Sequence, residues 1–100
     1  MNNENSLTNM PEVLIREMII KNRFGLHARP ASKFVKEAGK YKSSIYVERD
    51  GEEVNGKSIM GLMMLAAGEG SKLLVKASGE DASEALDALQ ELVSNKFGEE

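Results

Sequence analysis

The sequence predicts an α+β fold of two layers, in which helices cover one face of a four-stranded antiparallel sheet. Two observations lead to this fold class. Four short segments alternate apolar and polar residues, as half-buried strands do, and two longer segments repeat apolar residues every three or four positions, as amphipathic helices do. Because each strand has one apolar face that needs cover, the two longer helices are expected on that side of the sheet.

The first strand and the first helix follow a polar segment. Residues 1–11 are mostly Asn, Ser, Thr and Glu without an apolar period, and we expect them to be a disordered tail. The first strand is predicted at residues 13–21. A helix is predicted to start near Pro30, since the first turn tolerates a residue without an N–H, and to stop at Gly39. The apolar positions of this helix are Ala31, Phe34, Val35 and Ala38.

A hairpin, a short helix and a further strand come next. Residues 43–49 alternate in polarity, and the Asp-Gly pair after them is a strong turn signal, which predicts a partner strand at residues 52–55. The apolar, Met-rich segment 58–66 predicts about two helical turns, with the Ser58 hydroxyl as the N-cap. Residues 72–78 alternate again and predict the fourth strand.

The last helix has the clearest signature. Asp81 and Glu84 have the spacing of a capping box, in which each side chain accepts a hydrogen bond from a backbone N–H of the first turn. One apolar stripe follows, formed by Ala82, Ala85, Leu86, Leu89, Leu92 and Val93.

Length and composition limit the classes of function. One hundred residues make one domain, expected at residues 12–100. A net charge of −3 and only two tyrosines and three phenylalanines argue against a nucleic-acid-binding module, which needs a basic face and exposed aromatic side chains. With no cysteine and one histidine, no metal site is expected. Neither a membrane span nor a signal peptide is recognisable, so we expect a cytoplasmic protein that binds no membrane.

The segment that carries chemistry is residues 25–31, Gly-Leu-His-Ala-Arg-Pro-Ala. It places the single histidine, His27, where a loop meets the start of a helix, and Arg29 two positions later. Unpaired N–H groups and the helix dipole at such a start favour an anion such as a phosphoryl group. The Arg29 guanidinium offers paired donors for phosphoryl oxygens. Without a resemblance to a known motif, a lone histidine at a helix start is more often an ordinary surface residue than a functional one.

Residues 25–31 resemble the active-site motif of the histidine-containing phosphocarrier protein family, HPr, of the bacterial phosphoenolpyruvate-dependent phosphotransferase system. Residues 54–63, Val-Asn-Gly-Lys-Ser-Ile-Met-Gly-Leu-Met, resemble the second motif of that family at the expected separation. The resemblance extends over residues 12–97. It implies the HPr fold, an open-faced sandwich with the element order βαββαβα and antiparallel strands in the order 1-4-2-3.

The resemblance implies a relay of phosphoryl groups rather than an enzyme. In HPr proteins the motif histidine, here His27, accepts a phosphoryl group on Nδ1 from phospho-enzyme I and passes it to the IIA components of sugar permeases. Arg29 would hold the phosphoryl oxygens during both transfers, and Pro30 would fix the first helical turn. No cofactor is implied.

Ser58 has two compatible interpretations. As a helix N-cap it contributes about 1 kcal/mol to the stability of a short helix. By resemblance, it matches the regulatory serine that HPr kinase/phosphorylase phosphorylates in some HPr proteins. A phosphoserine at a helix start is accommodated by the same backbone amides that a cap uses.

The apolar residues of the short helix are the expected docking surface. By resemblance, Ile59, Met60 and Met63 would contact enzyme I and IIA. The core positions of the same segment are expected to be Leu62 and Leu65.

Phe24, three positions before His27, replaces the small polar residue common in the family, which leaves an alternative open: an HPr paralogue with a mainly regulatory role in nitrogen or carbon signalling. We expect the protein to be a monomer.

Overall fold

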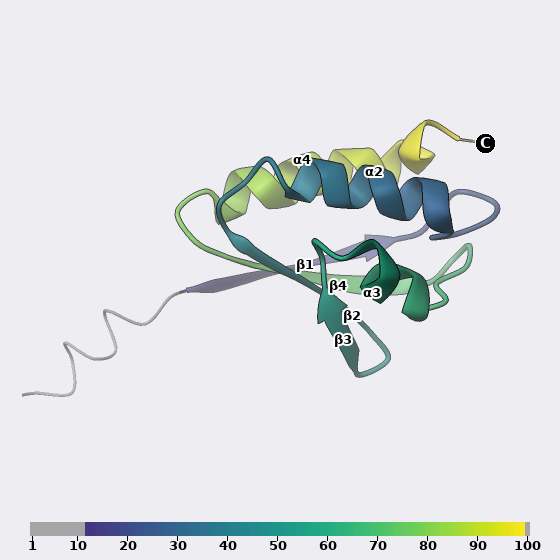
Figure 1. Ribbon diagram of the computed structural model, residues 1–100, viewed down its shortest axis with the longest axis horizontal. Helices are drawn as coiled ribbons and strands as arrows, with labels where there is room; N and C mark the ends of the chain where they lie inside the picture. Colours follow the sequence, from purple (N-terminus) through teal and green to yellow (C-terminus); the bar gives the residue numbers. More distant parts are fainter. Residues whose placement is uncertain (1–11, 100) are drawn as a thin grey trace, which may run out of the picture.

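The computed structural model describes residues 12–99 and has the element order expected from the sequence (Figure 1). The tail predicted at residues 1–11 lies outside the described residues. The strands are β1 (Val13–Ile19), β2 (Ser44–Arg49), β3 (Glu52–Asn55) and β4 (Lys72–Ser78). The helices are α2 (Ala28–Ala38), α3 (Ile59–Met64), α4 (Ala82–Ser94) and the 3₁₀ turn η1 (Lys96–Gly98).

The four strands form one antiparallel sheet in the order β1-β4-β2-β3, which confirms the predicted topology. The two edge strands, β1 and β3, are therefore separated by β4 and β2. Helices α2 and α4 lie side by side over one face of this sheet, and α3 packs against α2 and β3 (Figure 1). No helix of the described part of the chain is long and apolar enough to cross a membrane.

The core lies between the sheet and the two longer helices. Phe34 of α2 is fully buried, as are Leu86 and Leu89 of α4, and they face the inward positions of the strands. The inward strand positions are Met18, Ile45, Val47, Leu73, Val75 and Ala77. The alternating pattern of each strand thus places its apolar residues under the helices, which is why the sequence pattern predicted the layers correctly.

Several element ends differ from the prediction by one or two residues. Strand β1 stops at Ile19 rather than at residue 21, and α3 spans Ile59–Met64 rather than residues 58–66. The carbonyls of Leu62 and Met63 accept hydrogen bonds from the backbone N–H groups of Leu65 and Ala66 at the end of α3. Ala66 then turns the chain with a φ of 51°. Such ends are set by local backbone hydrogen bonds, which polarity patterns do not resolve.

The capping box predicted at Asp81 is wrong. Asp81 is the N-cap of α4, but its side chain accepts no hydrogen bond from the first turn of that helix. Its carboxylate instead accepts hydrogen bonds from the backbone N–H of Lys42 at 2.8 Å, from that of Ser43 at 3.0 Å and from the Ser43 hydroxyl. Ser43 is buried, so its N–H and hydroxyl need a protein acceptor more than the exposed start of α4 does. Asp81 therefore joins two loops.

The 3₁₀ turn after α4 is an element that sequence patterns did not indicate. Phe97, at its centre, is 1% exposed and contributes one of the largest fully buried side chains. Its φ of 55° lies in the left-handed region, and the preceding Lys96 has a φ of 59°. The cost of this backbone is offset by burial of the ring in the core. The turn also sends the chain back toward the start of α2.

We expect Asp81→Asn to lower the free energy of unfolding at neutral pH and to change its pH dependence. The hydrogen bonds from the Ser43 hydroxyl and the Lys42 amide hold the pKa of the Asp81 carboxyl below its ordinary value of 3.8. A carboxyl with a lowered folded-state pKa contributes stability above its unfolded pKa and loses it as the pH falls through the folded pKa. The difference between wild-type and variant urea midpoints should therefore shrink on acidification.

The control is Glu84→Gln, which removes an exposed carboxylate from the first turn of the same helix. Because no capping-box hydrogen bond holds Glu84, this variant should lose only the interaction of its charge with the helix dipole, about 0.3–1 kcal/mol, and less stability than Asp81→Asn. A wild-type advantage over Asp81→Asn that stays constant from neutral to strongly acidic pH would contradict the role assigned to the carboxylate.

Candidate functional site

His27 is the N-cap residue of α2. Its backbone is extended, with φ −81° and ψ −170°, and its carbonyl accepts the hydrogen bond of Ala31 N–H at 2.9 Å. Its side chain makes no capping hydrogen bond, so the ring is available for other contacts. Pro30 occupies the first turn, where its missing N–H leaves no helical hydrogen bond unmade. The helix start therefore presents an exposed imidazole beside unpaired backbone amides.

A tight junction of two loops holds His27 in this position. Gly25 has a φ of 72°, and a side chain at this position would overlap the carbonyl oxygen of Ala67 and the backbone of Gly68. The N–H of the next residue, Leu26, donates to the same Ala67 oxygen at 2.8 Å, and the Leu26 side chain is buried. The loop before α2 is thus fastened to the loop after α3.

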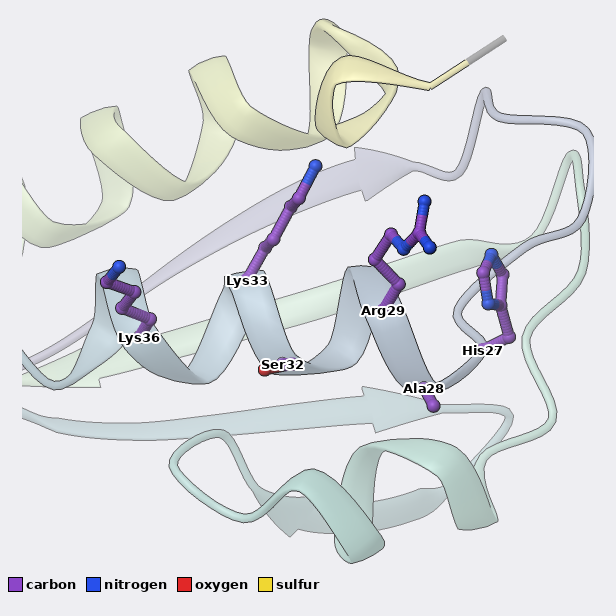
Figure 2. A pocket seen from close by; sticks show the side chains of 6 residues that line it. All are labelled: His27, Ala28, Arg29, Ser32, Lys33 and Lys36. Carbon is purple, nitrogen blue, oxygen red and sulfur yellow. The ribbon is translucent and has the colours of Figure 1, made fainter.

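Three basic side chains follow His27 along α2. An open depression of about 820 Å³ is lined by His27, Arg29, Lys33 and Lys36, together with small side chains of the same helix. Figure 2 shows His27, Arg29 and Lys33 projecting on one side of α2, whereas Ala28 and Ser32 point the other way. The Arg29 side chain is exposed and forms no ion pair or hydrogen bond with another residue of the range 12–99. Its guanidinium is therefore available for an anion beside the His27 ring.

The residues after α4 reach the same place. Nε2 of His27 lies 3.2 Å from Oε1 of Glu99, and the buried amide of Asn22 donates to the same oxygen at 3.3 Å. Nζ of Lys33 donates to the Phe97 carbonyl at 2.7 Å. Sequence reasoning identified none of Asn22, Lys33 and Glu99 as site residues. No local signal could have found Glu99, since 72 positions separate it from His27.

An apolar surface adjoins the histidine. Phe24 is 72% exposed and, with His27 and Met63, lines a depression of about 270 Å³. Arg23 lies over the Phe24 ring, 5.3 Å from its centre. Ile59 and Met60 of α3 are also exposed, as the docking hypothesis requires. Exposed apolar groups of this kind are typical of surfaces that bind partners. The expectation that the other two apolar positions are core is confirmed, because Leu62 and Leu65 are buried.

Ser58 is the N-cap of α3, as predicted. Its Oγ accepts a hydrogen bond from Gly61 N–H at 3.0 Å. The loop before it is held by Lys57, whose backbone N–H donates to Asn55 Oδ1 at 2.8 Å and whose Nζ donates to the Tyr41 carbonyl at 2.8 Å. Ser58 is half-buried and does not line the depressions around His27.

The structure thus brings together some of the residues predicted for the site and not others. His27, Arg29 and Phe24 line one further depression of about 520 Å³, together with Lys33 and Glu99. Met63 borders the apolar side of His27. The remaining predicted residues, Ser58, Ile59 and Met60, lie at the start of α3 and line none of these depressions.

Comparison with known proteins agrees with this arrangement. Residues 14–95 match the family model of the HPr component phosphorylation site of the phosphotransferase system. The phosphocarrier protein HPr of Pseudomonas aeruginosa is 52% identical over 84 residues, which cover 83% of this chain and 93% of that protein. The HPr-like protein Crh of Halalkalibacterium halodurans is 49% identical over 74 residues, or 74% of this chain and 88% of that protein.

Solved structures show the same similarity. A crystal structure of HPr from Thermoanaerobacter tengcongensis superimposes with a TM-score of 0.84 at 48% identity, covering 87% of this chain and 98% of that one. An HPr dimer from the same organism has a TM-score of 0.70 at 50% identity, covering 90% of this chain and 100% of that one. The fold, the two sequence motifs and these relatives agree, and the chain belongs to the HPr family of phosphocarrier proteins of the phosphotransferase system.

Proposed function

We propose that this protein carries a phosphoryl group on Nδ1 of His27, received from phospho-enzyme I and delivered to IIA components of sugar permeases. The observation that carries the proposal is the placement of the chain's one histidine at the exposed start of α2, beside Arg29, whose side chain has no ion-pair partner among residues 12–99. Both residues lie within the match to the family's phosphorylation site. The protein is then a substrate of other enzymes and works as a monomer.

The transfer exchanges one phosphorus–nitrogen bond for another. The lone pair of His27 Nδ1 attacks phosphorus, the bond from phosphorus to the donor imidazole breaks, and the donor ring leaves with the electron pair. Delivery to a IIA histidine repeats the exchange with His27 as the leaving group. Such a reaction depends on positioning and on stabilisation of the phosphoryl charge. Arg29 and the amides at the start of α2 supply that stabilisation.

Regulation by a kinase at Ser58 is the second part of the proposal. Residues 57–61, Lys-Ser-Ile-Met-Gly, resemble the segment around the serine that HPr kinase/phosphorylase phosphorylates in some HPr proteins, which supports this part of the proposal. The half-buried hydroxyl caps α3 next to the exposed Ile59 and Met60. A phosphoryl group there adds a charge of about −1.5 to −2 at the edge of the apolar surface. This charge would oppose docking of an acidic partner.

An alternative function is a regulatory paralogue that signals instead of feeding sugar uptake. One similar structure is described as Crh, the Bacillus subtilis catabolite repression HPr, which supports this alternative. The exposed Phe24 beside His27 supports it too. Phosphoryl delivery to IIA of a sugar permease, compared with IIA of a nitrogen-regulatory branch, distinguishes the two functions. Preference for the sugar-permease IIA supports the relay, and delivery confined to the other acceptor supports the paralogue.

We expect wild-type protein incubated with phosphoenolpyruvate and enzyme I to take up one phosphoryl group, because it has a single accessible imidazole at a phosphoryl-binding helix start. The linkage should be labile in acid and stable in base, as phosphohistidine is. Intact-protein mass spectrometry measures the uptake. His27→Ala should take up none, whereas Ser58→Ala should still be labelled. Full labelling of His27→Ala would rule out the proposed acceptor.

Arg29→Ala should keep the fold but slow transfer from phospho-enzyme I by about 30- to 150-fold, the effect of losing about 2–3 kcal/mol of charge stabilisation. The rate of transfer is measured by quenching samples of the reaction in base, where phosphohistidine is stable, at successive times. Arg29→Lys keeps the charge but loses the paired donors, so its transfer rate should lie between those of the wild type and Arg29→Ala. Lys72→Ala is the control and should react at the wild-type rate, because the Lys72 side chain lies on the uncovered face of the sheet and lines none of the depressions around His27. An unchanged rate in Arg29→Ala would assign the stabilisation to the backbone amides alone.

Ser58→Asp should accept phosphoryl groups from enzyme I more slowly than the wild type, because it places a negative charge beside Ile59 and Met60. Ser58→Ala should react at nearly the wild-type rate although it loses about 1 kcal/mol of helix capping. Transfer rates and urea midpoints of the three proteins separate the charge effect from the stability effect. Equal rates in all three would leave Ser58 as a helix cap without a regulatory role.

A further inference from the structure

We propose that Glu99 is a positioning residue for phosphoryl transfer: its carboxylate keeps the ring proton of His27 on Nε2, so that Nδ1 presents its lone pair to phosphorus. This inference rests on the proposed phosphocarrier function and adds to it the reason why one ring nitrogen, and not the other, is the acceptor. It assigns a role to a residue that neither sequence motif contains.

The contact between the two side chains determines which nitrogen carries the proton. Oε1 of Glu99 lies 3.2 Å from Nε2 of His27. An ionised carboxylate can only accept a hydrogen bond, so the ring must donate from Nε2. A neutral imidazole has a single N–H, and Nδ1 is then unprotonated and nucleophilic. The His27 side chain is 42% exposed and that of Glu99 is 17% exposed, so the contact is partly shielded from water.

Asn22 fixes the orientation of the carboxylate. Its Nδ2 donates to the Gly25 carbonyl at 2.8 Å and to Oε1 of Glu99 at 3.3 Å, and the residue is fully buried. The opposite amide orientation would direct Oδ1 at two acceptor oxygens, which is unfavourable. The amide therefore presents a fixed donor to Glu99, and the same Gly25 carbonyl ties that donor to the loop before His27.

The backbone that delivers Glu99 is anchored too. Phe97 is buried in the core, and Nζ of Lys33 donates to the Phe97 carbonyl at 2.7 Å. The N–H of Gly98 donates to the Asn95 carbonyl at 3.0 Å, and that of Glu99 to the Lys96 carbonyl at 2.8 Å. Glu99 therefore reaches His27 from a turn held by core packing and hydrogen bonds. Such pre-organisation is what a positioning residue requires.

The arrangement also balances charge during the reaction. When Nδ1 forms its bond to phosphorus and the donor's bond to phosphorus breaks, the His27 ring becomes a phosphorylated imidazolium that still has its proton on Nε2. No proton has to move in this step, and the Nε2–H bond to the Glu99 carboxylate becomes charge-assisted. Glu99 lies at the Nε2 edge of the ring, so its negative charge is away from the phosphoryl group at Nδ1.

The decisive measurement is the tautomer of His27 in the full, unphosphorylated chain. Protein with ¹⁵N-labelled histidine is recorded in alkaline buffer by long-range ¹H–¹⁵N correlation, which distinguishes protonated from unprotonated ring nitrogens. We expect the wild type to hold the proton on Nε2 to a greater extent than a short unfolded peptide containing Leu-His-Ala. In Glu99→Ala, the fraction of His27 with its proton on Nε2 should fall to the value of the peptide. The control is Glu91→Ala, which removes an exposed carboxylate from α4 and should leave this fraction at the wild-type value.

The kinetic measurement tests whether the tautomer serves the reaction. Glu99→Ala should accept phosphoryl groups from phospho-enzyme I about 10-fold more slowly, the expected effect of losing one charge-assisted hydrogen bond. Glu99→Gln can accept the Nε2–H bond without a charge, so it should retain the tautomer and recover part of the rate. A structural role alone would shift the urea midpoint without moving the tautomer.

Two results would overturn the inference: a wild-type proton mainly on Nδ1, or a tautomer population and transfer rate unchanged by Glu99→Ala. These results are separable from failure of the proposed function. A wild-type protein that takes up no phosphoryl group from enzyme I contradicts the phosphocarrier role, whereas the tautomer is read from protein that has never met enzyme I.

Discussion

The close contact between the loop before α2 and the loop after α3 is the constraint on which the rest of the site depends. Only a glycine fits at position 25, because its backbone has a φ of 72° and rests against Ala67. The Leu26 amide bonds to that same residue. This junction determines where α2 begins and therefore where His27 stands. It also places Phe24 beside Met63 of α3, so that the apolar surface borders the histidine.

A second anchor approaches His27 from the far end of the described chain. The Phe97 side chain is buried in the core, although its backbone has a left-handed conformation. Nζ of Lys33 donates a hydrogen bond to the Phe97 carbonyl. The turn then places Glu99 on the Nε2 edge of the ring, while Arg29 leaves the same helix start without a partner among residues 12–99. Glu99 thus contacts one edge of the imidazole, and the exposed Arg29 guanidinium of the same helix start is a cation that can bind an incoming anion. The site is prepared before any partner arrives.

The proposed docking surface consists of apolar side chains that are exposed beside the charged residues around His27. Phe24, Met60 and Met63 are exposed although apolar, and flexible methionine side chains adapt to partners of different shape. A carrier that must dock first with a donor and then with an acceptor benefits from such a surface. Ser58 stands at its edge, where it caps α3 through its hydroxyl. In the proposed regulation, a change of charge at Ser58 would weaken docking of a partner without changing the contacts of His27.

Local patterns determined the order of elements and the sheet face that is covered, because periodicity is encoded over a few neighbouring residues. The assignment of His27 and Arg29 came from the resemblance of residues 25–31 and 54–63 to two family motifs, since helix-start chemistry alone does not distinguish a functional histidine from an ordinary one. Local patterns misassigned the Asp81 carboxylate, which bonds to Ser43, 38 positions away, and they did not reveal Phe97 or Glu99. Those contacts form only when distant segments meet. Tertiary packing determines which buried donors lie within hydrogen-bond distance of a given acceptor, and the sequence of either segment alone does not contain that information.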